Sequence, residues 1–447
     1  MQFFLILFLL ISQTAWGATQ QVVFGGHYNN SSAASTEYFP PTGGSGVSVC
    51  IGETSESSAY QVFPADGTIT NFKVISSADP DNGAGTQSYK LTIRVNGAEP
   101  ATPTTCTVSD GATTCSDTTN ATTISAGDRI SIESVPTNTP TVGAYIWNFL
   151  WNPTTDDETI MTGNTGSDII NAGDGARYVR ITGCSFDEFD AGNADFIAPT
   201  AGVFKNLYIN GVTAPGAGNT KVYAFADSAG SETINCTVSG TATTCNSTLE
   251  TETATATAGE RFRVTVTGTS NPDGTIATFG IVFVPTTTGE FIIAGQTEDT
   301  TNSTTTEYIQ INTTSGLFTA TEVNVDSYAD TGSLSNDMTI EDIFVELSAD
   351  IGADSATYAF TLESNTATAS ALTCTVDGTA GGANKCNFSS SIAMTDGNFL
   401  STKVVPTNTP GAVFPMISYT GYIDPTAEAV EGNTTIYSST IYNATIY

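Results

Sequence analysis

The stretch that decides the fold is Cys106-Thr-Val-Ser-Asp-Gly-Ala-Thr-Thr-Cys115. It returns as Cys236-Thr-Val-Ser-Gly-Thr-Ala-Thr-Thr-Cys245 and again as Cys374-Thr-Val-Asp-Gly…Lys-Cys386. The first cysteines of the three copies lie 130 and 138 residues apart. Solenoid repeats have periods of roughly 20–50 residues, so this spacing is too long for them. It suits a whole domain with its own core, and the sequence therefore predicts three copies of one domain.

The segments around these cysteines have the pattern of β-strands. Apolar and polar residues alternate over residues 89–95, directly before the turn Asn96-Gly97, and the alternation returns over residues 261–266 and 358–362. No stretch sustains a 3.6-residue period with caps, so helices should be few and short. Short strands with frequent Gly, Asn and Asp turns predict an all-β fold of three tandem antiparallel β-sandwiches, similar to jelly rolls.

Clusters of Thr, Pro and acidic residues mark the expected boundaries between the copies. We expect the three sandwiches to occupy residues 19–157, 158–289 and 290–431. Each is large enough to bury a core, so each is expected to fold without the others.

The two ends of the chain differ from the repeats. Residues 1–18 are predicted to be a secretory signal peptide, because an apolar run over residues 3–11 precedes small residues suited to cleavage. The run is too short for a membrane helix. Residues 432–447 repeat Thr-Ile-Tyr every five residues. Such a segment can add a strand to another subunit's sheet, although it can also be the last strand of the third copy or an unpaired tail.

The eight cysteines of a secreted chain are first interpreted as disulfides. The spacing does not suit zinc, and no histidine is near. We predict the hairpin disulfides Cys106–Cys115, Cys236–Cys245 and Cys374–Cys386, with Asp110-Gly111 as a type I′ turn and Gly240-Thr241 as a type II′ turn. Cys50 and Cys184 lie 134 residues apart and are predicted to join neighbouring copies, with a bond to another chain as the alternative.

Composition argues against several classes of partner and activity. The net charge of −33, with only 12 Lys and Arg, repels nucleic acid and anionic lipid. His27 is the only histidine, and no Gly-x-Ser-x-Gly motif is present. The acidic runs at Asp156-Asp157-Glu158 and at Asp187, Glu188 and Asp190 do not single out a catalytic pair. We therefore predict no catalytic residue, no cofactor and no enzymatic activity.

Two further kinds of site depend on loop residues. The loop Asp79-Pro-Asp81-Asn82-Gly83 places oxygen atoms around a turn but lacks the spacing of an EF-hand, so no metal site is predicted. Sequons for N-glycosylation are about as frequent as expected by chance in a chain so rich in Ser and Thr. They therefore allow glycosylation but do not by themselves predict it. They occur at Asn29, Asn30, Asn120, Asn235, Asn246, Asn302, Asn312, Asn387, Asn433 and Asn443.

The order of features in the first copy resembles a loosely defined group of phage-like and bacterial surface proteins with tandem β-sandwich repeats. The shared features are Ile69–Val74, Asn96-Gly97, Cys106–Cys115, Ala126-Gly127-Asp128 and Thr139-Pro140. The second copy lacks the Asn-Gly turn, and the third lacks Ala-Gly-Asp. The resemblance implies a fibre, spike or cell-surface protein, and the signal peptide favours one that is secreted, including a virion glycoprotein.

The expected function is that of a secreted extracellular structural protein, a building block of a surface layer, fibre or virion-type particle. Its partners would be other copies of itself or surface proteins, with no membrane span in the mature chain. The alternative is a carbohydrate-binding adhesin with glycan sites on its loops. Trp147 and Trp151 lie in an apolar strand, so we expect them in a core rather than on a sugar-binding platform.

Overall fold

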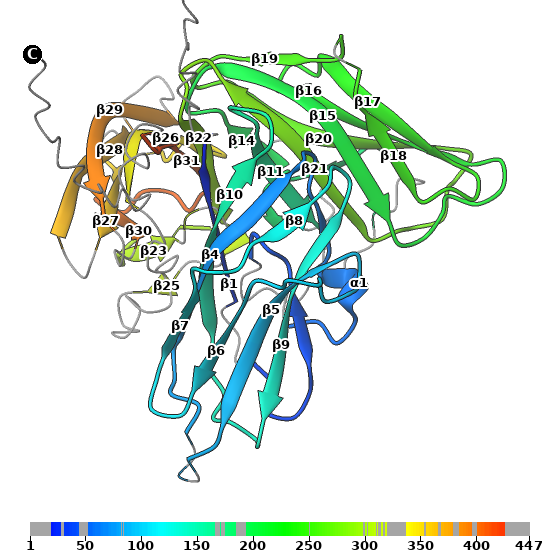
Figure 1. The fold of residues 1–447 in the computed structure, drawn as a ribbon. Helices are drawn as coiled ribbons and strands as arrows, with labels where there is room; N and C mark the ends of the chain where they lie inside the picture. The colour runs from blue at the N-terminus through cyan, green and yellow to red at the C-terminus, as the bar shows by residue number, and fades with distance from the viewer. Residues whose placement is uncertain are drawn as a thin grey trace, which may run out of the picture.

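The computed structural model describes residues 19–424 apart from 28–30, 44–51, 82, 84, 166–169, 171–174, 185–193, 250, 298–299, 302, 310, 312–313, 316–317, 320–336, 353–354, 365–367, 379–383 and 396–399. Six β-sheets pair into three sandwiches that follow one another along the chain (Figure 1). The α-helix of this part of the chain is the single turn α1 (Glu56–Ala59). None of its helices is long and apolar enough to cross a membrane. The all-β prediction is confirmed.

The first sandwich contains residues up to Pro153. One of its sheets has the order β1 (Gln21–His27), β10 (Tyr145–Pro153), β4 (Gly67–Ser76) and β7 (Thr114–Asp117), with β8 (Thr122–Ile124) also paired to β4. The other has the order β2 (Glu37–Phe39), β9 (Arg129–Thr137), β5 (Ser88–Val95) and β6 (Thr105–Ser109), with β3 (Gln61–Val62) also paired to β9.

The second sandwich repeats this arrangement. One sheet has the order β13 (Gly183–Cys184), β11 (Thr159–Asn164), β21 (Ala277–Pro285), β15 (Gly202–Gly211) and β18 (Thr244–Ser247), with β19 (Ala254–Ala256) beside β15. The other has the order β12 (Arg177–Val179), β20 (Arg261–Thr269), β16 (Thr220–Asp227) and β17 (Glu232–Ser239), with β14 (Phe196–Ile197) beside β20.

The third sandwich has the same plan. One sheet has the order β24 (Thr314–Ser315), β22 (Glu290–Thr297), β31 (Pro415–Tyr422), β26 (Met338–Leu347) and β29 (Lys385–Met394). The other has the order β25 (Phe318–Thr319), β23 (Glu307–Ile309), β30 (Leu400–Thr407), β27 (Thr357–Ser364) and β28 (Thr368–Asp377). The predicted boundaries at residues 157/158 and 289/290 fall in the turns before β11 and β22.

The strand order identifies the sandwiches as jelly rolls. When the eight main strands of a copy are numbered along the chain, one sheet has the order 1-8-3-6 and the other 2-7-4-5. Most connections therefore cross from one sheet to the other, which is the double Greek key of a jelly roll.

The prediction that each cysteine pair closes a β-hairpin is wrong. β6 pairs with β5, and β7 pairs with β4, so the strands that carry Cys106 and Cys115 lie in opposite sheets. The turn between them is present, since Ala112 N donates to Ser109 O at 2.9 Å. The sequence predicts this turn, but it does not reveal that the chain passes from one sheet to the other there. The predicted type I′ turn is also absent there, because only Gly111 has a positive φ. The turn Asn96-Gly97, where φ is +54° and +82°, has the character of type I′.

A β-bulge recurs at the same place in all three copies. The register shifts near the middle of β4, β15 and β26. Asn71, Asn206 and Asp342 occupy these positions with φ of +51°, +57° and +48°. Asn and Asp tolerate the left-handed region better than other residues with a Cβ atom, so the repeated choice of residue follows from the bulge.

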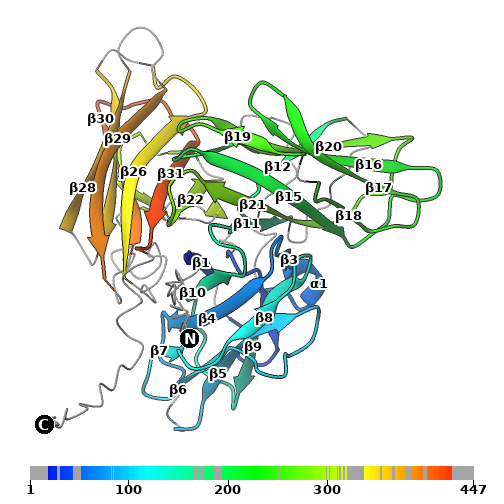
Figure 2. The same cartoon turned by 45° about the horizontal axis from the view of Figure 1, so that its top comes forward.

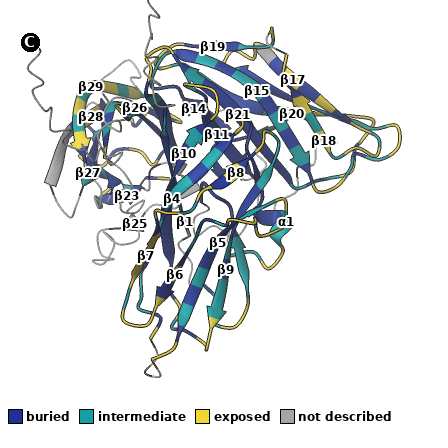
Figure 3. Ribbon diagram, viewed as in Figure 1, coloured by how far each residue is buried: buried dark blue, intermediate teal, exposed yellow. Residues whose placement is uncertain are grey.

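Each sandwich encloses a cluster of buried apolar residues, and Figure 3 shows buried residues along most strands and exposed ones in loops and in outer strands such as β29. Trp147 and Trp151 are fully buried in the first sandwich, as predicted. Their indole N–H groups donate to Pro41 O at 2.7 Å and Glu158 O at 3.1 Å. Neither ring is therefore a platform for a sugar.

Candidate functional site

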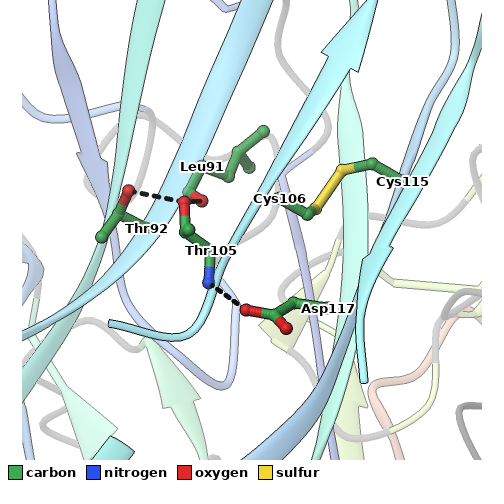
Figure 4. Close-up of a disulfide and its surroundings, with 6 residues drawn as sticks. All are labelled: Leu91, Thr92, Thr105, Cys106, Cys115 and Asp117. Atoms are coloured by element: carbon green, nitrogen blue, oxygen red, sulfur yellow. Dashed lines mark hydrogen bonds between the residues drawn. A yellow bond between two sulfur atoms is a disulfide. The ribbon is translucent and has the colours of Figure 1, made fainter. Parts of the chain in front are cut away.

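Each cysteine pair joins the two sheets of a sandwich at their outer edge. The Cα atoms of Cys106–Cys115, Cys236–Cys245 and Cys374–Cys386 are 5.6, 5.7 and 5.8 Å apart, and Figure 4 shows the first bond. The bonds close the open side of each jelly roll and indicate an oxidising environment. Cys184 is buried and also disulfide-bonded. Cys50, its predicted partner, lies outside the described residues.

Asp117 braces the edge beside the first disulfide (Figure 4). Its carboxylate accepts hydrogen bonds from Thr105 N at 2.9 Å, Asn120 Nδ2 at 2.9 Å and Thr119 N at 3.1 Å. Burial acts to raise the pKa of Asp117, but these hydrogen bonds outweigh it and lower the pKa from 3.8 to about 2. The carboxylate therefore links β7 to β6 across the gap between the sheets.

This brace predicts a loss of stability in acid. Because the pKa of Asp117 is lower in the folded than in the unfolded chain, its contribution is present above about pH 4 and is lost as the pH falls toward 2. Asp117→Asn should cost at most about 2 kcal/mol of unfolding free energy at pH 7, since solvent at the sheet edge screens part of the effect, and less at pH 3. Urea unfolding at the two pH values measures this. An equal cost at both would show that the charge of the carboxylate does not contribute.

The three sandwiches pack against one another head to tail. In each, the outer face of the first and last main strands carries apolar residues. These are Val22, Phe24 and Leu150 in the first sandwich, Ile160 and Val282 in the second, and Ile292 and Ala294 in the third. The outer residues of the first sandwich belong to the hydrophobic core of the third sandwich. The outer residues of the second belong to the core of the first, and the outer residues of the third belong to the core of the second. Contacts that run in one direction and return to the start form a closed ring.

Figures 1 and 2 agree with this ring. Three lobes meet at a centre that contains β1, β10, β11, β22 and β31. The shared cores also change the expectation that each copy folds alone, because a separated copy would expose an apolar face.

Equivalent contacts recur at two of the interfaces. Before β9, Gly127 lies against Tyr208 of the second sandwich, where a Cβ atom would be 3.1 Å from the ring. Before β20, Gly259 lies in the same way against Phe344 of the third sandwich, at 3.3 Å. The two interfaces therefore share this contact between a glycine and an aromatic ring.

Two buried glutamines at the first of these interfaces are paired as in a protein interior. Gln61 is fully buried; its Nε2 donates to Gly183 O at 3.1 Å, and its Oε1 accepts from Thr162 Oγ1 at 3.2 Å. The side-chain amide of Gln21 bonds the backbone N–H and C=O of Ile160 at 2.8 and 2.9 Å. Such pairing is typical of a permanent interface.

A cavity of about 460 Å³ lies between the first and second sandwiches. The first sandwich contributes Tyr60 and Arg129 to its wall, and the second contributes Asn164, Asn210 and Thr244. The guanidinium of Arg129 lies over the ring of Tyr60, 4.7 Å from its centroid. The wall thus combines a cation with amide and hydroxyl groups, which suits a polar ligand.

The acidic residues singled out in the sequence have structural partners. Asp79 Oδ1 accepts from Asp81 N at 2.9 Å and Gly111 N at 3.1 Å. Asp157 accepts from Thr288 Oγ1 at 3.1 Å, and Glu158 pairs with Lys205 at 2.8 Å. In the described part of the chain, no cluster of three His, Cys, Asp or Glu residues could hold a metal ion.

The remaining predicted residues fall in several places. His27 is the last residue of β1. Of the sequons, Asn235, Asn246 and Asn387 are exposed, whereas Asn120 is half-buried against Asp117. The residues outside the described part of the chain are Asn29, Asn30, Asn82, Asp187, Glu188, Asp190, Asn302, Asn312, Asn433 and Asn443, together with the segments 1–18 and 432–447.

No protein-family model matches the chain, and no curated protein matches it. Its function must therefore be inferred from its own geometry.

Proposed function

We propose that the protein is a secreted extracellular structural protein, a building block of a surface layer, fibre or virion-type particle, that acts by assembly of its β-domains. The observation that supports this most is the closed head-to-tail packing of three jelly rolls. Buried interfaces hold the three in one orientation. A unit that is already ordered loses little conformational freedom when it assembles.

The third sandwich offers an edge for assembly. In the first two sandwiches the corresponding edge is divided into short strands, β7 and β8 or β18 and β19. In the third, the ten-residue strand β29 runs along the whole edge, and β26 is its only partner among the described strands. Phe388 within it is 44% exposed. A long continuous edge strand is a template for an added strand.

The occupant that we assign to this edge is the segment 432–447 of a neighbouring chain. The segment has high β-propensity, with its three Thr-Ile-Tyr repeats, and it carries no charged side chain. The unbroken β29 edge provides backbone groups for such a strand to pair with.

Size-exclusion chromatography with light scattering, at increasing protein concentration, tests assembly. Residues 19–447 should form oligomers, shells or filaments, and deletion of residues 432–447 should leave monomers. Phe388→Lys should also weaken assembly, because a charge protects a strand edge. Val142→Lys, at another exposed apolar residue, is the matched control and should assemble normally. Monomers at every concentration would overturn the proposal.

A further inference from the structure

Two equivalent arginines lie at equivalent interfaces. Arg129 pairs with Val62 of β3, and Arg261 pairs with Ile197 of β14, so the two arginines hold the same position in the first and second sandwiches. Each lies near the next sandwich along the ring. Their surroundings differ in a way that indicates a binding site.

At the interface between the second and third sandwiches, two carboxylates lie beside the arginine, and one of them, Asp195, also pairs with Arg263 at 3.2 Å. Arg261 Nη1 lies 3.4 Å from Asp195 Oδ2 and 3.6 Å from Glu346 Oε1. The side chain of Asp195 is 1% exposed and that of Glu346 is 11% exposed. This position of the jelly roll therefore accommodates buried carboxylates beside the arginine.

At the interface between the first and second sandwiches, both carboxylates are replaced by uncharged groups. When the strands are aligned by their pairing, Tyr60 of the first sandwich is equivalent to Asp195 of the second. In the same way, Asn210 of the second sandwich is equivalent to Glu346 of the third. No described carboxylate forms an ion pair with Arg129. The nearby Glu56 is held by Arg94 at 2.8 Å and by Ser131 Oγ at 2.8 Å. Arg129 instead faces the cavity of about 460 Å³.

A second observation at the cavity also indicates a ligand. Asn164 is 1% exposed, and its Nδ2 donates to Ser58 O at 3.0 Å. Its Oδ1 is buried and has no hydrogen-bond partner in the structure. A buried acceptor without a partner is costly, and a small shift of this amide toward the cavity that Asn164 lines would let a hydroxyl group there satisfy it.

We propose that this cavity binds a carboxylated sugar, such as a uronic acid, with its carboxylate on Arg129 and a hydroxyl group on Asn164. The ligand carboxylate would take the place that Glu346 takes beside Arg261. Amide and hydroxyl groups of Asn210 and Thr244 suit the other sugar hydroxyls, and the cavity volume is in the range of small-molecule sites. The site lies between sandwiches rather than on loop tips, and it is independent of the proposed assembly.

Isothermal titration of residues 19–447 with sodium glucuronate tests the proposal. Methyl glucuronide, in which the anomeric position is blocked as in a chain end, distinguishes a glycan terminus from a free sugar. Methyl glucoside, which lacks the carboxylate, is the ligand control. We expect binding of one or both carboxylated sugars, and affinity at least about tenfold lower for Arg129→Gln, because a charge-assisted hydrogen bond is lost. Lys90→Gln removes the same charge at an exposed position and should bind normally.

Asn210→Glu provides a second test that does not depend on the folding of the arginine variant. It places a carboxylate where the equivalent Glu346 lies, so it should abolish glucuronate binding and leave the melting temperature equal or higher. The proposal is overturned if neither carboxylated sugar binds, if Arg129→Gln or Asn210→Glu binds as tightly as the parent chain, or if methyl glucoside binds equally well.

Discussion

Gly280→Ala is expected to disrupt the contact between the first and second sandwiches. Gly280 lies in β21, where an added Cβ atom would overlap Val62 O and lie 3.0 Å from Pro64 Cδ. The nearest obstacle is backbone that is itself held, since Val62 N donates to Thr278 Oγ1 at 2.8 Å. The sandwiches must move apart to accept the methyl group. Overpacking of this kind costs about 3 kcal/mol at the upper end of its usual range.

Gly411→Ala is the matched control for this substitution. Neither glycine has a positive φ, and a Cβ atom at Gly411 would come no closer than 3.4 Å to its nearest neighbour, Ile351 O. Urea unfolding should therefore show a large loss for Gly280→Ala and little change for Gly411→Ala. Equal stability of the two variants would mean that the first two sandwiches are not in close contact at this point.

Removal of the first disulfide has the second large expected effect. Cys106 and Cys115 are separated by nine residues in sequence and join opposite sheets. The chain-entropy model assigns about 3 kcal/mol to a loop of this size. Cys106→Ala with Cys115→Ala should lower the free energy of unfolding by this amount, because the sheets can separate at their outer edge.

The same double substitution at Cys236 and Cys245 is the internal comparison, because that bond also has a separation of nine residues and a similar Cα–Cα distance. The two losses, measured by urea unfolding without reductant, should agree within about 1 kcal/mol, since context modifies such values. No loss in either variant would contradict the role of the bonds as clips between the sheets.

Much of the fold is predictable from the sequence because the repeat, the alternation of apolar residues and the turns are local. The alternation over residues 89–95 gives the buried face of β5 directly. It does not identify the partner strand, and for this reason the sequence alone suggests a hairpin for the Cys106–Cys115 segment. The order of strands depends on contacts between segments far apart in the sequence.

The ring has a signal in the sequence that alternation alone does not explain. β10 (Tyr145–Pro153) carries large apolar residues on both faces, Trp147 and Phe149 on one and Ile146 and Leu150 on the other. Strands with two apolar faces are covered on both sides, which indicates a neighbour beyond their own sandwich. Which sandwich covers which face is a property of the three-dimensional arrangement.

The sequence predicts the equivalence of the two arginines at the candidate sugar site, but not the difference between their partners. Ala126-Gly-Asp-Arg129 and Ala258-Gly-Glu-Arg261 show that the two arginines are equivalent. The difference lies in their partners, Tyr60 against Asp195 and Asn210 against Glu346. Those positions have no local similarity and can be matched only through the pairing of strands.

Scanning calorimetry of residues 19–431 tests most directly whether the three jelly rolls form one unit. Each core cluster includes side chains of a neighbouring sandwich, so we expect one transition whose calorimetric and van't Hoff enthalpies are equal. Three separate transitions, at the melting temperatures of the isolated segments 19–157, 158–289 and 290–431, would contradict the ring.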